Sequence, residues 1–244
     1  MQKSKIKALI LIATYVAISA TNLFSQQTSP LTLTGDEKGF ISIFDGKSLN
    51  GWEGDSVYWR VEDGKIIGQV TPKTILKRNS FLIWRGGTTG DFELKLEYKV
   101  SADGNSGINY RSFEVDGLPF ALRGYQCDID GVDYWTGQNY EERGRTFLAL
   151  RGQITQITDD EKPVEIGTVG AKDQLKEYIK KGDWNEIHLI IKGNTLIHII
   201  NKHVMSIVVD NDINNRKNDG LLGVQVHVGP PMTIEYRNIR IKRF

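Results

Sequence analysis

Three short segments of the sequence place polar side chains at alternate positions between apolar ones. They are Gly107–Ser112, Tyr125–Asp130 and Gly223–Gly229. In a β-strand, alternate side chains point to the same face. Amide, carboxylate, guanidinium and imidazole groups are the donors and acceptors that hydroxyl-rich ligands need. We therefore predict a polar ligand-binding face built from these strands, carrying Asn109, Arg111, Gln126, Asp128, Asp130, Gln225 and His227.

Asp128 and Asp130 lie two residues apart, which is about 7 Å along an ordinary strand. At that separation two carboxylates could share a metal ion or divide the roles of acid and base. The alternative is that both decorate a solvated face, and a single histidine on a strand is likewise more often a hydrogen-bonding group than a catalyst. Cys127 alternates with the polar positions, so we expect it in the core rather than as a nucleophile.

The segment Gly131–Gly144 is polar and rich in glycine, which predicts a loop rather than a strand. It carries Trp135 and Tyr140, whose rings could stack on sugars or could simply fasten the loop to the fold. Four charged residues end the segment or follow it, and they could form a surface ion-pair patch or place Glu142 and a guanidinium at the rim of a cleft. These four are Glu141, Glu142, Arg143 and Arg145.

The elements that position these residues are predicted to be short strands, because period-two alternation dominates from Gly39 onward. Turn-forming residues separate the strands, and one short helix is expected at 171–181, capped by Gly182. Many short strands with frequent turns indicate a jelly roll or another β-sandwich of two antiparallel sheets. No linker divides residues 39–244, so we predict one domain there, preceded by a flexible leader at 26–38.

Composition excludes several classes of protein. The chain has 244 residues, with 31 Lys and Arg against 30 Asp and Glu. A net charge of +1 excludes a strongly basic nucleic-acid binder. A single cysteine excludes an internal disulfide framework and any cysteine-clustered metal site.

The N-terminus has the order of a secretory signal peptide: three lysines, the apolar run 8–20, and a small residue, Ser25, before a polar stretch. The apolar run is shorter than the roughly 20 residues that span a bilayer. No cysteine lies near the expected cleavage point, which argues against a lipoprotein anchor. We expect residues 1–25 to be removed and the mature protein to be periplasmic or extracellular, without a membrane span.

Several motifs in order along the chain resemble the 3-keto-disaccharide hydrolase domain family. The resemblance covers about residues 40–244. It is carried by IFDGKSLNGW at 43–52, WRVEDG at 59–64, GDFELKL at 90–96, GNSGINYR at 104–111, GDWN at 182–185, the strand 223–229 and YRNIRI at 236–241. Membership would imply a concanavalin A-like jelly roll that acts on 3-keto-glycosides in an exported protein.

The resemblance implies a chemistry that needs one base, one acid and a group that stabilises an enolate. For that chemistry we hypothesise that His227 is a base or metal ligand, that Asp128 and Asp130 are further base or metal-ligand candidates, and that Arg111 binds an enolate or a hydroxyl group. A divalent metal held by Asp128, Asp130 and His227 could polarise the ketone, although no cofactor is established by the sequence. The remaining candidates are expected to bind the keto-sugar substrate: Asn109, Gln126, Gln225, Glu142, Trp135 and Tyr140.

Two other functions fit the same residues. A noncatalytic carbohydrate-binding module would use the polar face and the aromatic side chains without acid–base groups. A structural or adhesive sandwich would leave Asp128 and His227 apart, each in solvent. Convergence of Asp128, Asp130, Arg111 and His227 in one pocket would favour an enzyme, whereas a shallow groove lined by aromatic side chains would favour a binding module.

Overall fold

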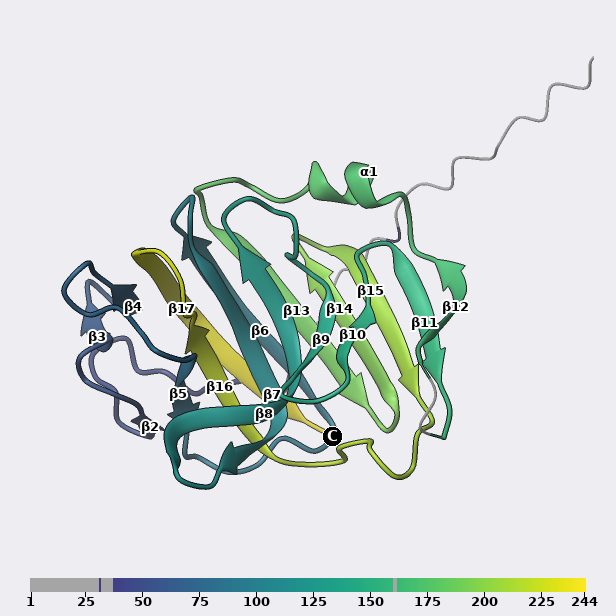
Figure 1. Cartoon of the computed structure of the whole chain (residues 1–244), viewed down its shortest axis with the longest axis horizontal. Helices are drawn as coiled ribbons and strands as arrows, with labels where there is room; N and C mark the ends of the chain where they lie inside the picture. Colours follow the sequence, from purple (N-terminus) through teal and green to yellow (C-terminus); the bar gives the residue numbers. More distant parts are fainter. Residues whose placement is uncertain (1–30, 32–36, 160–161) are drawn as a thin grey trace, which may run out of the picture.

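The computed structural model describes residues 31, 37–159 and 162–244, which form two β-sheets packed face to face (Figure 1). Within those residues the larger sheet has ten strands. Nine of them lie in the order β12 (Val164–Thr168), β11 (Gln153–Ile157), β15 (His203–Asp210), β14 (Thr195–Ile200), β13 (Asn185–Lys192), β6 (Phe92–Val100), β17 (Met232–Arg243), β4 (Lys65–Val70) and β3 (Trp59–Glu62), and β1 (Ile41–Ser42) pairs with β17. The smaller sheet, counted over the same residues, has seven in the order β10 (Thr146–Ala149), β9 (Asn139–Glu142), β8 (Leu118–Asp130), β7 (Asn105–Val115), β16 (Leu221–Val226), β5 (Ser80–Trp84) and β2 (Trp52–Glu53).

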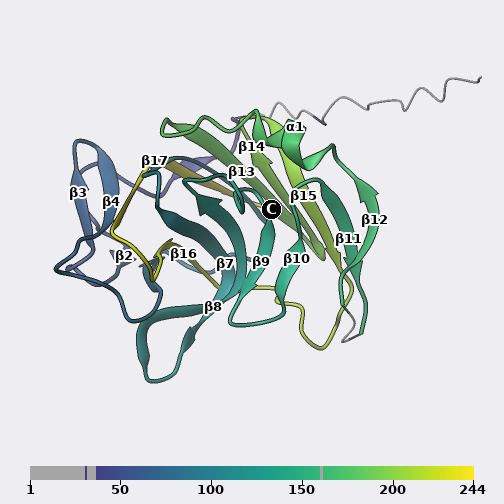
Figure 2. The same cartoon turned by 45° about the horizontal axis from the view of Figure 1, so that its top comes forward.

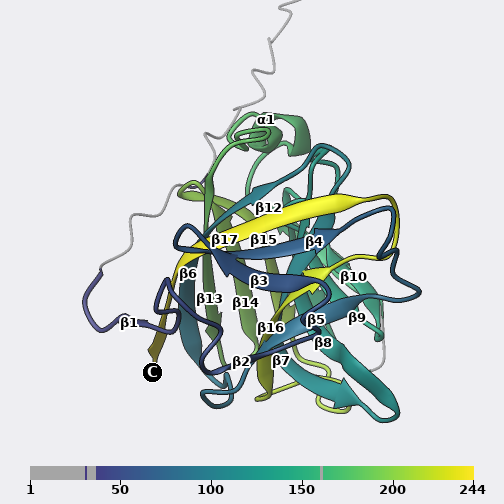
Figure 3. The ribbon, with the colours of Figure 1, turned by 90° about the vertical axis from the view of Figure 1, so that its left-hand side faces the viewer.

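The expected jelly-roll sandwich is confirmed, with one departure from antiparallel pairing: β11 and β15 run parallel. The last strand, β17, lies inside the larger sheet, between β6 and β4. Figure 3 shows β17 beside β4, with β3 on the other side of β4; these two strands come from a part of the sequence far from β17. The sheet therefore joins segments that are far apart in the chain.

Period-two alternation builds the core as predicted. In β6, Phe92, Leu94 and Leu96 are almost fully buried between the sheets. Glu93 and Glu97 alternate with them on the other face, where they pair with basic side chains of β17. Full burial of a large apolar side chain stabilises the fold by roughly 1.5–3 kcal/mol. Cys127 on β8 is also buried in this core, as expected.

The long hairpin of β7 and β8 is bent. Its register shifts near Arg111, whose φ of 45° is left-handed. On β8, Gly124 lies opposite this bend and has a φ of 152°. A Cβ at this position would lie 2.4 Å from Oγ of Ser112. The bend folds the hairpin tip over the outer face of the smaller sheet, where Leu122 packs with Phe81 of β5. This face carries the candidate site.

Two local expectations differ from the structure. The helix α1 covers only Lys172–Lys176, not 171–181, and buries only Leu175 of its own residues. Figures 1 and 2 place it at the end of the sandwich opposite the β7–β8 turn. The prediction that 131–144 contains no strand is wrong, because β9 forms at its end. The polar residues of β9 are buried, and hydrogen bonds and ion pairs satisfy them. The segment therefore lacks the alternation of apolar and polar residues from which a strand is predicted.

The N-terminal predictions are not tested by the structure. The expected signal peptide and most of the expected leader lie outside the described residues. No helix in the described part of the chain is both long and apolar enough to cross a membrane.

Candidate functional site

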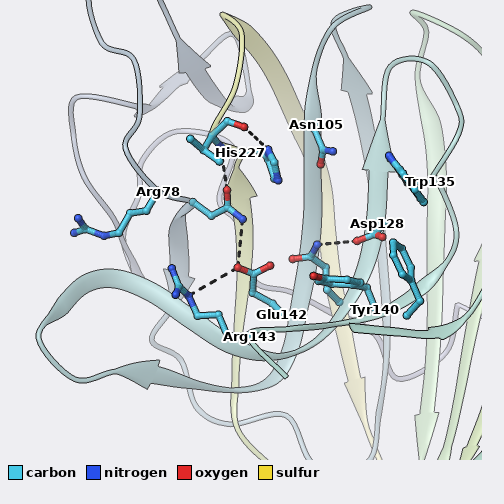
Figure 4. A pocket seen from close by; sticks show the side chains of 12 residues that line it. Arg78, Asn105, Asp128, Trp135, Tyr140, Glu142, Arg143 and His227 are labelled. Atoms are coloured by element: carbon cyan, nitrogen blue, oxygen red, sulfur yellow. Dashed lines mark hydrogen bonds and ion pairs between the residues drawn. The ribbon is translucent and has the colours of Figure 1, made fainter. Parts of the chain in front are cut away.

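A pocket of about 580 Å³ lies on the outer face of the smaller sheet (Figure 4). Strands β7, β8, β9 and β10 contribute to it, together with the loop after β8, the connection between β4 and β5, and the segment that follows β16. Its lining consists of Arg78, Asn79, Asn105, Gln126, Asp128, Trp135, Tyr140, Glu142, Arg143, Phe147, His227 and Val228. Six of the side chains that the sequence nominates are therefore brought together: Gln126, Asp128, Trp135, Tyr140, Glu142 and His227.

Asp128 lies on the floor of the pocket and is only 9% exposed. Its Oδ1 accepts a hydrogen bond from Nε2 of Gln126 at 2.7 Å. Burial raises the pKa of Asp128 to about 8, an effect that the Gln126 hydrogen bond opposes and that Asp130 and Glu142 increase through their negative charge. At neutral pH the carboxyl group is therefore mostly protonated and can donate a proton.

Glu142 forms another side of the pocket. Burial raises the pKa of Glu142, and hydrogen bonding to Asn79 and the charge of Arg143 oppose that rise. Asn79 donates from Nδ2 to Oε1 of Glu142 at 3.3 Å and accepts the backbone N–H of Val228 at 2.9 Å. This amide therefore ties β9 to the segment that follows β16.

His227 follows the last residue of β16, and its ring points into the pocket (Figure 4). Its Nδ1 lies 2.5 Å from the carbonyl oxygen of Val228, so Nδ1 carries the hydrogen and donates it. Burial lowers the pKa of His227 below 6.5, which leaves the ring neutral at pH 7. None of the described residues hydrogen-bonds Nε2, which therefore presents a lone pair to a ligand.

Aromatic side chains form a further wall of the pocket. Trp135 stacks on Phe147 with ring centroids 5.1 Å apart, and Tyr140 meets Phe147 edge to face at 5.2 Å. Phe147 is 40% exposed, so the wall offers an apolar surface to solvent or to a ligand. A flat apolar surface beside polar groups suits a sugar ring, which has one apolar face and a polar rim.

Asp130 does not line the pocket, although the alternation places it on the same face as Asp128. Its Oδ1 accepts the backbone N–H groups of Trp135 and Thr136 at 2.9 and 2.8 Å, and its Oδ2 accepts that of Tyr134 at 2.8 Å. The Thr136 hydroxyl also donates to Oδ1 at 2.7 Å. Asp130 is therefore an anchor for the loop that carries Trp135.

Arg111 also lies elsewhere. Its side chain is 1% exposed, and Nη2 pairs with Oδ1 of Asp91 at 2.9 Å. The rest of its guanidinium donates to backbone carbonyls of Gly90, Gly193 and Lys217. With its donors used in this way, Arg111 fastens connecting segments together and does not reach the pocket to bind an enolate or a hydroxyl.

Asn109 and Gln225 are fully buried and also do not line the pocket. Asn109 donates to Oγ of Ser112 at 3.3 Å. Gln225 donates to Oε1 of Gln126 at 3.1 Å, so it contacts a lining residue from behind.

The predicted metal ligands are not assembled into a site. Because the Asp130 carboxylate faces the loop backbone, only Asp128 and His227 of that set remain in the pocket. Over residues 37–159 and 162–244, no three His, Cys, Asp or Glu side chains converge as they would to hold a metal ion.

Residues 39–242 match the model of the 3-keto-alpha-glucoside-1,2-lyase-like domain. The chain belongs to this family. A 3-keto-disaccharide hydrolase from Bacteroides thetaiotaomicron shares 26% identity with it over 275 aligned positions, covering 94% of this chain and 87% of that protein.

Solved structures agree with the 3-keto-glucoside lyase-like fold. A protein from Parabacteroides distasonis, provisionally assigned as a glycosyl hydrolase, superposes with a TM-score of 0.55 at 20% identity, covering 88% of this chain and all of that one. A carbohydrate-binding module from Bacillus subtilis superposes with a TM-score of 0.53 at 12% identity, covering 79% and 95% of the two chains. At these identities the superpositions show a shared fold.

Five lining residues of this 3-keto-glucoside lyase-like domain were not nominated by the sequence: Arg78, Asn79, Asn105, Phe147 and Val228. Arg78 and Asn79 precede a strand, and Asn105 follows a turn, as many surface residues do. The structure decides between the two interpretations of the charged residues at 141–145. Glu142 and Arg143 line the pocket, whereas Glu141 and Arg145 pair with each other at 2.5 Å.

Proposed function

We propose that this protein cleaves 3-keto-glycosides by elimination followed by hydration, which amounts to hydrolysis. One observation carries the proposal: a single pocket holds an imidazole whose pKa is lowered and a carboxyl group whose pKa is raised. A pair of groups shifted in opposite directions can act as base and acid at the same neutral pH. The family and the 3-keto-disaccharide hydrolase relative support the choice of a 3-keto substrate.

In the first half-reaction, the ketone at C3 acidifies the hydrogen on C2. Nε2 of His227 takes that proton, the released electron pair forms the C1–C2 double bond, and the C1–O1 bond breaks. Asp128 gives its proton to the departing oxygen, so the aglycone leaves as a neutral alcohol. General acid–base catalysis of this kind contributes about 10²–10⁴-fold each time a proton is transferred.

In the second half-reaction, water adds to the enone. Asp128, now a carboxylate, takes a proton from the water as its oxygen bonds to C1, and His227 returns its proton to C2. Both side chains regain their starting protonation states. The free 3-keto sugar and the alcohol together contain the atoms of the substrate and one water.

The remaining pocket groups suit a sugar. We propose that the wall formed by Trp135, Tyr140 and Phe147 stacks on the ring, and that Gln126 and Glu142 hydrogen-bond hydroxyl groups. The order of charges and apolar residues at the N-terminus supports export, and we propose that the reaction takes place in the periplasm or outside the cell.

The deciding experiment compares 3-keto-glucosides with the corresponding unoxidised glucosides. The purified protein should release aglycone from the keto compounds only, because only they have an acidic C2 hydrogen. Cleavage of both would point to an ordinary glycosidase. Cleavage of neither, together with measurable sugar binding, would replace the proposal with a noncatalytic binding module.

Replacing His227 with Ala should lower kcat on a 3-keto-disaccharide by at least about 100-fold, because the base that removes the C2 proton is lost. The matched control is His203→Ala: His203 stacks on Tyr178 and does not line the pocket. Steady-state kinetics of the two variants measure the difference. Near-normal turnover by the His227 variant would remove this residue from the mechanism.

A noncatalytic sugar-binding role is favoured by one observation, the exposed aromatic wall. Replacing Trp135 with Ala should weaken sugar binding about tenfold, since one aromatic stacking contact contributes about 1–1.5 kcal/mol. Trp184→Ala is the control, because Trp184 lies outside the pocket under the guanidinium of Arg237. Calorimetry with the product sugar measures affinity. The acid and base are intact in the Trp135 variant, so its kcat should stay within a few-fold of the wild type. Unchanged sugar affinity would exclude the wall as the sugar-binding surface.

A further inference from the structure

Two side-chain amides, linked by a hydrogen bond, lead from β16 to Asp128 in the pocket. Gln225, fully buried on β16, donates from Nε2 to Oε1 of Gln126 at 3.1 Å. Gln126 donates in turn from Nε2 to Oδ1 of Asp128 at 2.7 Å, which is the dashed line beside Asp128 in Figure 4. Gln225 therefore contacts Asp128 only through Gln126.

The surrounding strands leave room for these two amides and hold them in place. Gly107 of β7 is paired with Asp128 in register, and a Cβ at this glycine would lie 2.5 Å from Cδ of Gln126. The Gln126 side chain thus lies directly over a position without a side chain. The backbone of Gln225 is fixed as well, because its carbonyl accepts the hydroxyl of Ser106 at 2.5 Å.

We propose that Gln225 is a positioning residue, which orients the amide of Gln126 so that an N–H group points at Asp128. A carboxamide can present either its N–H₂ or its oxygen to a neighbour. Gln225 presents its N–H₂ to Gln126, so the Gln126 oxygen faces inward, while Oε1 of Gln225 has no hydrogen-bond partner among the described residues. An N–H directed at Asp128 stabilises the carboxylate that remains after the proton has left. The catalytic consequence of this inference rests on the proposed function, whereas the orientation itself does not.

Loss of the Gln225 donor would leave Oε1 of Gln126 buried without a hydrogen-bond partner. That costs free energy, which the amide recovers by turning its oxygen toward a protonated Asp128. The protonated form of Asp128 is then favoured over the carboxylate. Other groups near Asp128 are unchanged by the substitution: Asp130 on its own strand, Tyr140 and Glu142 on β9, and His227 after β16.

The test is a pH titration of the Asp128 carboxyl group by ¹³C NMR in the wild type and in Gln225→Met, which keeps the length of the side chain. The signal is assigned by its absence in Asp128→Asn. The titration midpoint in Gln225→Met should move upward by about one pH unit, since a hydrogen bond to a charged group is worth about that much. The alkaline limb of the pH–rate profile on a 3-keto-disaccharide should move with it.

Two further variants make the test specific. Gly107→Ala displaces the Gln126 amide while leaving Gln225 and Asp128 in place, so it should shift the midpoint in the same direction and serves if Gln225→Met does not fold. Asn185→Ala, which removes a buried amide on β13 of the other sheet, should leave the midpoint unchanged. An unmoved midpoint in both Gln225→Met and Gly107→Ala overturns the inference. A moved midpoint in a protein that cleaves no keto-sugar upholds the inference and rejects the proposed function.

Discussion

Asp128→Asn should lower turnover of a 3-keto-disaccharide about 10³-fold but lower that of 4-nitrophenyl 3-keto-glucoside by less than about tenfold. The alkoxide that leaves from a disaccharide needs a proton, and asparagine has none to give. Nitrophenolate is a stable anion and leaves without one. The contrast between the two substrates therefore isolates the role of Asp128 as an acid, and steady-state rates at pH 7 measure it.

Equal loss on both substrates would mean that Asp128 is the base, and the assignment of roles to Asp128 and His227 would then be reversed. The control is Asp133→Asn, because Asp133 is also a buried carboxylate whose pKa is raised by burial but it lies outside the pocket. That variant should keep normal rates on both substrates.

The same Asp128 variant has a signature in stability that needs no substrate. Because the pKa of Asp128 in the fold is about 8, above its ordinary value of 3.8, the folded protein holds a proton between these pH values that the unfolded chain has released. Stability of the wild type therefore falls as pH rises through this window and levels off above it. Asparagine removes that loss, so the variant should be more stable than the wild type at pH 9, by roughly 4–6 kcal/mol, and equal to it near pH 4.

Asp130→Ala should destabilise the fold by about 2–4 kcal/mol, the largest loss that we expect from a single substitution near the site. Three backbone N–H groups and one hydroxyl lose their acceptor together, and the loop that carries Trp135 is released from β8. Denaturant unfolding measures the loss. Sugar affinity should fall with it, because the aromatic wall loses Trp135.

Asp130→Asn separates anchoring from catalysis at this position. Its amide oxygen can still accept the N–H groups of Trp135 and Thr136, so the loop should stay in place and activity should remain within about tenfold of the wild type. A loss of several hundredfold in a folded Asp130→Asn protein would show that the negative charge itself takes part in the reaction.

Where the strands are regular, the sequence was enough to predict which residues line the pocket. Alternation from Ile108 to Ile129 assigned Cys127 to the core and Gln126 and Asp128 to the opposite face, and the structure agrees. The same reasoning failed for Arg111, because its left-handed backbone breaks the period of two and turns its side chain toward the connecting segments that contain Asp91 and Lys217. A single residue with positive φ leaves no mark in an alternating pattern.

Other parts of the site depend on contacts between distant segments. Asn79 reaches Glu142 and Val228, which lie 63 and 149 residues further along the chain. Asp130 is on the predicted face, yet the loop after it folds back and takes up its carboxylate. Periodicity assigns a residue to a face of a strand, but it contains no information on which loop returns to that face.

The position of β17 has a consequence for when the protein can fold. The last regular strand, Met232–Arg243, supplies the hydrogen bonds that join β6 to β4. A nascent chain that lacks these 12 residues cannot close the larger sheet, however much of it has already left the ribosome. Long-range pairing of this kind slows folding. We therefore expect the chain to stay unfolded until β17 has been synthesised, and an unfolded chain is the state that a protein needs if it is to be threaded through a translocation channel.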